Sequence, residues 1–307
     1  MADPFPLVEL PGHPGVIVLS LEPNQGPMVV LDLALIQRIE ASLRSVPRDA
    51  TGLILASRSP RVFIAGADLK QIESLDVPAL DQYLAFGQRV FGMLPQLTIP
   101  TVAALNGAAL GGGLELAMHC DGLVAAPPPP RDGQPGRPYP IGLPEAGLSI
   151  CPGWGGTNLL PARIDPADAI RRTATGRTLT LDEAAAAGLV QTLAPSPDTL
   201  LPTAASWLAA NRTAPGQRRD GKPLHWIGRP NVAARVTSAY LDVRDELGSQ
   251  GHSAAAAAVL KAVGAGLENG WEAALAVERT ELNRLRHADA GRAAIRAFFE
   301  KSAAPRS

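Results

Sequence analysis

The sequence has little cysteine and no long apolar run. Cys120 and Cys151 are the two cysteines among 307 residues, which fits a reducing compartment better than a disulfide framework. They form no cluster of ligand types, so we expect no metal site. No apolar segment reaches the length that a bilayer-spanning helix needs. The first residues, MADPFPLVEL, lack the basic and apolar regions of a signal peptide. We therefore expect a cytoplasmic protein.

An excess of charge of one sign is also absent. The chain has 28 Lys and Arg against 29 Asp and Glu, for a formal net charge of -1. This balance indicates neither a nucleic-acid partner nor a membrane surface as a partner. A hydrophobic content of 46% and a charged content of 19% are typical of a globular protein. The length fits one large domain or a core with a smaller appendage.

Short apolar runs alternate with helical patterns over the first two thirds of the chain. Val16–Leu21, Gly52–Ala56 and Thr101–Leu105 read as buried strands bounded by turn residues. Leu33–Leu43 has apolar residues at helical spacing, and Asp32 is placed to cap that helix. This alternation predicts an α/β layered domain.

Two segments interrupt or end this pattern. Residues 126–140 (APPPPRDGQPGRPYP) contain too much proline and glycine for a helix or a central strand, so we expect a surface insertion with polyproline character. From about Leu200 onward the sequence favours helix almost throughout. We therefore expect an α/β core over residues 1–200, with the insertion at about 126–140, and a helical C-terminal region over 201–307.

A glycine run precedes one apolar helical pattern. Gly111, Gly112 and Gly113 follow the Thr101–Leu105 strand, and a helix is expected over Leu114–Cys120. Such a helix start leaves backbone N–H groups unpaired and open to a ligand with negative charge. Glu115 lies within this apolar helix, where an ionised carboxylate is costly to bury. Close packing by the glycines, and a favourable helix dipole for Glu115, are the alternative explanations.

Two further stretches carry similar features. Phe63–Lys70 (FIAGADLK) passes from an apolar run through a small-residue loop into a polar segment. Gly142–Leu160 (GLPEAGLSICPGWGGTNLL) contains Glu145, which follows Pro144 and is alternatively explained as a charge at a helix N-terminus. Its glycine-rich turn is followed by Thr157, which we expect to cap a helix.

The three stretches in this order and spacing resemble the crotonase superfamily, also called the enoyl-CoA hydratase/isomerase family. Leu179–Val190 (LTLDEAAAAGLV) matches a further segment of that family, and the resemblance covers residues 15–195 well. It implies a crotonase-like β-β-α spiral core with a helical C-terminal region. It also implies an acyl-CoA thioester substrate, no separate cofactor, and assembly as a homotrimer or a dimer of trimers.

The resemblance assigns a role to each stretch. Backbone N–H groups of Ala67 and Gly112 correspond to the family's oxyanion hole, which holds the negative charge that develops on the thioester oxygen. The positions that correspond to CoA and substrate contacts are Ala65, Gly66, Asp68, Leu69, Lys70 and Gly111. Lys70 is equally well explained as a solvated side chain.

Two glutamates of the family's hydratases have counterparts here. The resemblance implies that Glu115 positions and deprotonates the water, and that Glu145 delivers a proton to the α-carbon. Members that have only the second glutamate tend to be isomerases, so the presence of both favours an enoyl-CoA hydratase. A Δ3-Δ2-enoyl-CoA isomerase that needs only Glu145 is one alternative. A catalytically silent acyl-CoA-binding paralogue is the other.

Some features depart from the family pattern or have simpler explanations. The Glu115–Glu145 spacing of 30 residues is longer than usual, and the proline-rich insertion accounts for the excess. Residues 251–301 resemble the hydratase half of multifunctional fatty-acid oxidation proteins. No GxGxxG motif follows, so we expect no NAD requirement. His119 is expected to be a packed histidine, Cys151 an unreactive thiol, and Phe298 and Phe299 core residues.

Overall fold

The computed structural model describes residues 2–130, 134, 136–212 and 219–303. It divides into two compact units, each made of segments that are separate in the sequence. The first unit comprises Met1–Ala67, Arg89–Ile141 and Leu179–His225, and the second comprises Asp68–Gln88, Gly142–Thr178 and Trp226–Ser307. Among the described residues, no helix is both long and apolar enough to cross a membrane.

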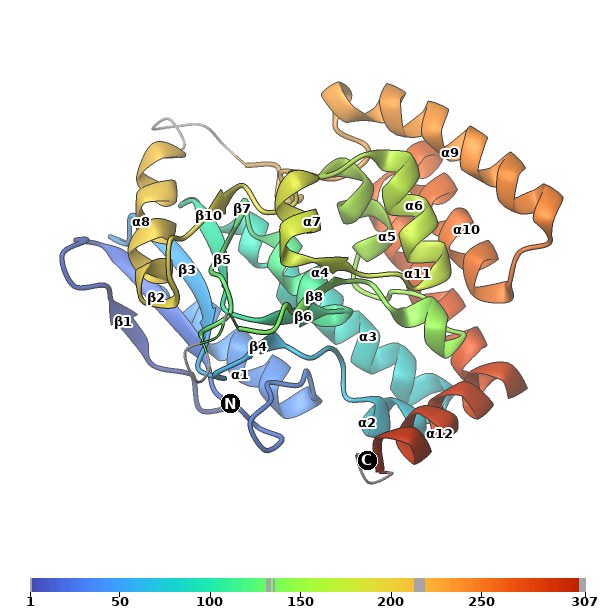
Figure 1. The fold of residues 1–307 in the computed structure, drawn as a ribbon, viewed down its shortest axis with the longest axis horizontal. Helices are drawn as coiled ribbons and strands as arrows, with labels where there is room; N and C mark the ends of the chain where they lie inside the picture. Colours follow the sequence, from blue (N-terminus) through green and yellow to red (C-terminus); the bar gives the residue numbers. More distant parts are fainter. Residues whose placement is uncertain (1, 131–133, 135, 213–218, 304–307) are drawn as a thin grey trace. The chain divides into compact units, whose positions relative to one another are not determined.

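The first unit is built on a six-stranded sheet with the order β1-β2-β3-β5-β7-β10 (Figure 1). β1 is antiparallel to β2, and every other neighbouring pair is parallel. β5 and β7 are buried along their whole length, as the near-continuous apolar sequence of a central parallel strand requires. These six strands span Leu7–Glu9, Val16–Leu21, Gly52–Ser57, Thr101–Leu105, Gly122–Ala125 and Thr192–Leu193.

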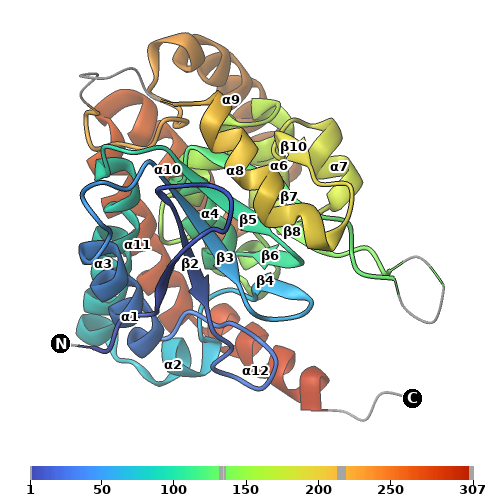
Figure 2. The ribbon, with the colours of Figure 1, turned by 90° about the vertical axis from the view of Figure 1, so that its left-hand side faces the viewer.

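Helix α8 (Leu200–Ala210) covers one face of this sheet (Figure 2). Its Ala204, Ala205 and Leu208 belong to one buried cluster with side chains from β2, β3, β5 and β7. The fit is close, because a Cβ added to Gly122 would lie 2.3 Å from the Trp207 ring. Helix α8 begins at Leu200, where we expected the helical C-terminal region to begin. Its packing nevertheless makes it part of the core of the first unit.

A second, four-stranded sheet in the first unit has the order β4-β6-β8-β9. Its strands span Val62–Ile64, Ala108–Leu110, Pro140–Gly142 and Leu179–Thr180. β4 and β6 run parallel, so the loops that leave their carboxyl ends emerge at the same edge. Helix α4 (Gly112–His119) starts directly after β6. The remaining helices of this unit are α1 (Leu33–Arg44), η1 (Leu94–Gln96), α7 (Leu181–Ala186) and η4 (Pro197–Thr199).

The second unit is helical, and α11 (Trp271–His287) contacts most of its parts. It packs against α5, α10 and α12, and Gln88 of α3 donates a hydrogen bond to the Leu275 carbonyl of α11 at 2.9 Å. The other elements are α2 (Leu69–Ser74), α3 (Val77–Phe91, whose last residues belong to the first unit), η2 (Glu145–Leu148), α5 (Gly156–Leu159), η3 (Leu160–Ala162), α6 (Pro166–Thr175), α9 (Pro230–Gln250), α10 (Ala254–Asn269) and α12 (Asp289–Ala303).

Most predicted elements are confirmed, with three corrections. The helix expected over Leu114–Cys120 begins at Gly112, so two of the three glycines lie inside it. Thr157 is not a helix cap; Gly155 occupies that position with φ 104°, and Thr157 lies within α5. Phe298 is not a core residue, because it is 44% exposed on α12. The cap by Asp32 is confirmed by its hydrogen bond to the Leu35 N–H at 2.7 Å.

The structure describes only part of the predicted proline-rich insertion, and it does not test the predicted division of the chain at residue 200. Of the proline-rich insertion, residues 131–133 and 135 lie outside the described residues. Its two ends are joined, since the Tyr139 hydroxyl donates to the Ala126 carbonyl at 2.7 Å. The division into regions 1–200 and 201–307 stays a prediction.

A buried carboxylate ties together three parts of the first unit. Asp121, which lies between α4 and β7, accepts two hydrogen bonds from the Arg219 guanidinium at 2.9 and 2.7 Å. It also accepts the backbone N–H of Thr101 at 2.8 Å, at the start of β5. Asp121 is 5% exposed. Because Asp121 is buried and Arg219 is only partly exposed, removal of either partner leaves a poorly solvated charge, which lowers stability.

We expect Asp121→Asn to lower the free energy of unfolding by about 2 kcal/mol, because the partly buried Arg219 charge loses its counter-ion. Urea denaturation of wild type and variant measures the difference. The double variant Asp121→Asn/Arg219→Met should recover part of the loss. Equal stabilities of the wild type and the single variant would contradict this account.

Candidate active site

The loops after β4 and β6 approach each other closely in the first unit. A Cβ added to Gly66, whose φ is 112°, would lie 3.3 Å from the Leu110 carbonyl oxygen. A Cβ added to Gly113 would lie 2.6 Å from the Ile64 Cβ. Glycine is required at both positions, at Gly66 also because φ lies in the left-handed region. The parallel pairing of the two strands thus brings the FIAGADLK and GGG stretches to one edge of the sheet.

The two N–H groups expected to form the oxyanion hole both belong to these loops. Ala67 forms a bridge with Leu31, in which the Leu31 N–H bonds to the Gly66 carbonyl at 2.9 Å. Gly112 is the first residue of α4, where a helix has no internal acceptor for its N–H groups. In the described part of the chain, neither the Ala67 N–H nor the Gly112 N–H donates to another protein group. Both donors are therefore available to a ligand.

Glu115 lies in the first turn of α4 and is 1% exposed. Its backbone N–H donates to the Gly111 carbonyl at 3.0 Å. Its own carbonyl is 2.9 Å from Nδ1 of His119, whose ring packs edge-on against Phe91 at 5.8 Å between centroids. The expectation that His119 is a packed residue is thus confirmed. A buried carboxylate lies one turn beyond the available Gly112 N–H.

The remaining predicted contact residues are divided between the two units. Ala65 follows β4, and its N–H donates to the Val29 carbonyl at 2.8 Å. Gly111 precedes α4 with φ 51° and ψ −128°. In the second unit, Asp68 caps α2 by accepting the N–H groups of Lys70 at 2.9 Å and Gln71 at 3.2 Å. Leu69 opens that helix and is half-buried, and the Lys70 side chain is exposed.

Glu145 opens the short helix η2 in the second unit. Its Oε2 atom is buried and, within the described residues, has no hydrogen-bond partner. The helix ends at Ser149, a non-glycine residue with φ 58°. Gly176 packs against η2, because a Cβ there would lie 2.6 Å from the Gly147 backbone N. The backbone that carries Glu145 is therefore tightly confined.

Burial determines the charge state of Glu145. Burial and, to a lesser degree, the neighbouring carboxyl of Glu278 raise the pKa of this group from its usual value near 4.5 to about 8. Its own backbone N–H lowers the pKa in part, but an ionised carboxylate with one buried oxygen lacking a donor is poorly stabilised in an apolar environment. Glu145 therefore carries a proton at neutral pH, which is the state that a general acid needs.

Glu278 of α11 is a buried carboxylate that the sequence analysis missed. It is 0% exposed, and burial raises its pKa to about 7. A signal was present in the sequence: Ala274, Glu278 and Leu282 follow one another at helical spacing, so the carboxylate lies on the apolar face of its helix. The argument applied to Glu115 would have found it.

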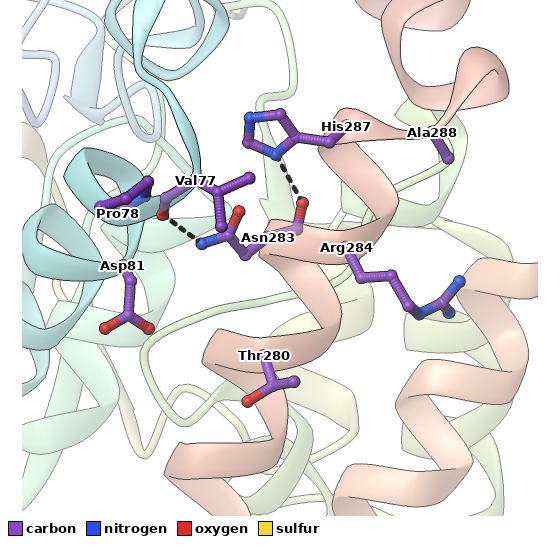
Figure 3. A pocket seen from close by; sticks show the side chains of 8 residues that line it. All are labelled: Val77, Pro78, Asp81, Thr280, Asn283, Arg284, His287 and Ala288. Atoms are coloured by element: carbon purple, nitrogen blue, oxygen red, sulfur yellow. Dashed lines mark hydrogen bonds between the residues drawn. The ribbon is translucent and has the colours of Figure 1, made fainter.

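The described residues contain no group of three or more His, Cys, Asp or Glu able to hold a metal ion. The second unit also has a cavity of about 520 Å³ between α3 and α11 (Figure 3). Asn283 borders it and donates to the Val77 carbonyl at 2.7 Å. None of the predicted site residues lines this cavity, whose lining comprises Val77, Pro78, Asp81, Thr280, Asn283, Arg284, His287 and Ala288.

Residues 14–216 match the family model described as Enoyl-CoA hydratase/isomerase. The chain is 30% identical over 277 residues to the fatty acid oxidation complex subunit alpha of Shewanella baltica, which covers 88% of this chain and 38% of that protein. It is 38% identical over 150 residues to the crotonyl-CoA hydratase of Syntrophomonas wolfei, which covers 49% of this chain and 54% of that protein. The matches thus span less than two thirds of the length of either relative.

The fold has close counterparts among solved structures. The crystal structure of enoyl-CoA hydratase from Bacillus anthracis matches with a TM-score of 0.58 and 25% sequence identity, and it covers 96% of both chains. The predicted crotonase-like fold with a helical C-terminal region is therefore confirmed.

The left-handed backbone at Ser149 predicts an effect on stability. We expect Ser149→Gly to raise the free energy of unfolding by about 0.5–1 kcal/mol, since relief of left-handed strain exceeds the added flexibility of the unfolded chain. Denaturant titration measures the change. Ser45→Gly is the matched control, because Ser45 has φ −97° and gains nothing from glycine. A loss of stability in Ser149→Gly would contradict the expectation.

Proton binding by Glu145 predicts a pH dependence. Between about 4.5 and 8 the folded protein holds a proton that the unfolded chain releases, so the free energy of unfolding should fall as pH rises through this window. The slope contributed by one proton is about 1.4 kcal/mol per pH unit at most. Glu145→Gln keeps a neutral side chain at every pH, so the decline should be shallower in this variant. Thermal unfolding at intervals from pH 5 to 8 measures both slopes, and equal slopes would exclude the protonated carboxyl.

Proposed function

The chain belongs to the enoyl-CoA hydratase/isomerase family, and we propose that it adds water to trans-2-enoyl-CoA to give 3-hydroxyacyl-CoA. The observation that carries this proposal is the Glu145 carboxyl, which is buried and has a pKa raised to about 8. Glu115 supplies a second buried carboxyl, near two unused backbone donors. The similarity to the crotonyl-CoA hydratase of Syntrophomonas wolfei also supports the proposal of a hydratase activity.

The first half of the reaction forms the carbon–oxygen bond. Glu115 accepts a proton from water, and the water oxygen bonds to C3 of the enoyl group. The C2–C3 double-bond electrons move toward the thioester, and negative charge develops on its carbonyl oxygen. The N–H groups of Ala67 and Gly112 hold that charge, and each such donor is worth about 3 kcal/mol of barrier.

The second half returns the electrons to carbon. Glu145 gives its proton to C2, the thioester carbonyl re-forms, and the Ala67 and Gly112 donors are released. Glu115 then holds the proton taken from water and Glu145 is ionised, so exchange with solvent restores both groups. One water has been added and no redox change has occurred, which is why the proposal includes no cofactor beyond the CoA of the substrate.

The resemblance to the family supplies the remaining parts of the proposal. Ala65, Gly66, Gly111 and the 68–70 segment bind the CoA part of the thioester, and the exposed Lys70 side chain suits a phosphate group. The protein acts in the cytoplasm as a homotrimer or a dimer of trimers. Sedimentation of the purified protein distinguishes these assemblies from a monomer.

The test is hydration of trans-2-enoyl-CoA, followed by loss of the conjugated thioester absorbance. We expect turnover by the wild type, and we expect Glu115→Gln and Glu145→Gln each to lower kcat by about 10²–10⁴-fold, since each variant removes a proton-transfer group. Glu272→Gln, an exposed change on α11, is the matched control and should keep full activity.

The same variants distinguish the alternative functions. A Δ3-Δ2-enoyl-CoA isomerase would convert the 3-enoyl substrate in Glu115→Gln but not in Glu145→Gln. A silent paralogue would bind acyl-CoA saturably without turnover. Either outcome would replace the hydratase proposal.

A further inference from the structure

Glu278 holds the turn that precedes α5 through both of its carboxylate oxygens. Oε2 accepts the Gly155 N–H at 2.5 Å, and Oε1 accepts the Thr157 N–H at 2.9 Å and its hydroxyl at 2.5 Å. These N–H groups lie at the start of the four-residue helix α5, where the helix itself offers no acceptor. A side chain from another helix, Glu278 of α11, accepts them instead. Hydrogen bonds to an ionised carboxylate are about twice as strong as neutral ones. The arrangement therefore favours the ionised form of Glu278.

The segment that connects Glu145 to this turn also runs along α11. The Cys151 thiol lies 3.8 Å from the Glu278 backbone carbonyl. A Cβ added to Gly153 would lie 2.8 Å from a methyl group of Leu282, one turn further along the same helix. The position of α11 thus determines the course of the chain from η2 to α5.

Glu145 and Glu278 differ sharply in their donors. Glu278 has three donors to its two oxygens, whereas the Glu145 carboxyl accepts its own backbone N–H and its Oε2 has no donor within the described residues. Burial raises the pKa of Glu145 most, and the negative charge of Glu278 adds to that rise. Two like charges buried near each other do not both ionise easily, so one proton is retained by the pair. The donors select Glu145 as its holder.

We propose that Glu278 is a positioning residue for Glu145: it fixes the 155–157 turn, and its negative charge keeps the proton of the pair on Glu145. This inference rests on the proposed function for its catalytic meaning, because a general acid must hold its proton until C2 receives it. The proton distribution itself is independent of that function.

Several other charged groups of the second unit have partners of their own. On α10, Lys261 pairs with Glu281 at 2.6 Å, and on α3, Asp81 pairs with Arg279 of α11 at 2.8 Å. On α6, Arg172 pairs with Asp168 at 2.7 Å.

Two further arginines of the second unit are partly or wholly buried. Arg163 follows η3 with part of its guanidinium buried. Arg286 of α11 donates to backbone carbonyls of Ile72, Glu73 and Leu75. The charged residues of α12, which packs against η2, are exposed: Asp289, Arg292, Arg296, Glu300 and Lys301. The charge that acts on Glu145 is that of Glu278.

The experiment follows the infrared carbonyl band of the protonated Glu145 carboxyl as pH rises. The band is assigned by its loss in Glu145→Gln. In Glu278→Gln, we expect the pH at which the band is half lost to fall by about one unit or more, because the neighbouring negative charge is gone. A matched control is Glu281→Gln, which changes a buried glutamate of the same helix that pairs with Lys261 and Arg284. This control should leave the midpoint unchanged.

Thr157→Val provides a milder second variant, because it removes only the hydroxyl that donates to Glu278. The Glu278 anion is then less well stabilised, so part of the proton should move to Glu278 and the Glu145 band should weaken at pH 7. This variant decides the matter if Glu278→Gln does not fold, as judged by circular dichroism. An unchanged midpoint in folded Glu278→Gln, an unchanged band in Thr157→Val, or an equal shift in Glu281→Gln would each overturn the proposal.

The hydration assay separates this inference from the proposed function. If the wild type hydrates enoyl-CoA, the alkaline fall of its kcat should move to lower pH by about one unit in Glu278→Gln. If the wild type does not turn over, the proposed function fails, and the infrared midpoints still decide whether Glu278 controls the proton of Glu145.

Discussion

The hydrogen bonds from Glu278 to the 155–157 turn organise the second unit. A fully buried carboxylate is tolerated only when donors surround it, and here the donors come from a four-residue helix that could not persist alone. Asn158 extends the network, since its side chain donates to the Thr157 hydroxyl at 2.8 Å and to the Ala262 carbonyl of α10 at 3.2 Å. The backbone carbonyl of Asn158 accepts the Ile227 N–H at 3.1 Å. One carboxyl group thereby helps to connect α5, α10, α11 and the chain that leads to α9.

In the first unit, the candidate oxyanion-binding site is formed by backbone groups rather than by a buried carboxylate. Parallel pairing of β4 and β6 places two loops at one sheet edge, and glycine at positions 66 and 113 allows their backbones to come close. Each loop then leaves an N–H group, at Ala67 and Gly112, without an acceptor of its own. Such orphan donors weaken the isolated fold slightly, but they are already oriented for a ligand whose oxygen gains negative charge. Catalytic electrostatics of this kind costs no rearrangement at the moment of reaction.

Several parts of this protein were readable from the sequence because they depend on local chemistry. The apolar runs at Val16–Leu21 and Thr101–Leu105 predict strands, and Asp32 is recognisable as a cap, because periodicity and capping involve neighbours along the chain. The GGG run and the FIAGADLK stretch carry the family resemblance, so the fold and the candidate residues were also accessible. Thr157 was misread as a cap because its hydroxyl is used by Glu278, 121 residues away.

The sequence by itself determined which residue types are available and where strands and helices form, since those depend on short-range patterns. Only the tertiary structure decided the charge states and the contacts between distant segments. Glu145 resembles any surface glutamate in the sequence; burial of its Oε2 and the nearby Glu278 raise its pKa to about 8. Desolvation and like-charge repulsion depend on distance in space rather than along the chain, so the proton on Glu145 is a property of the fold.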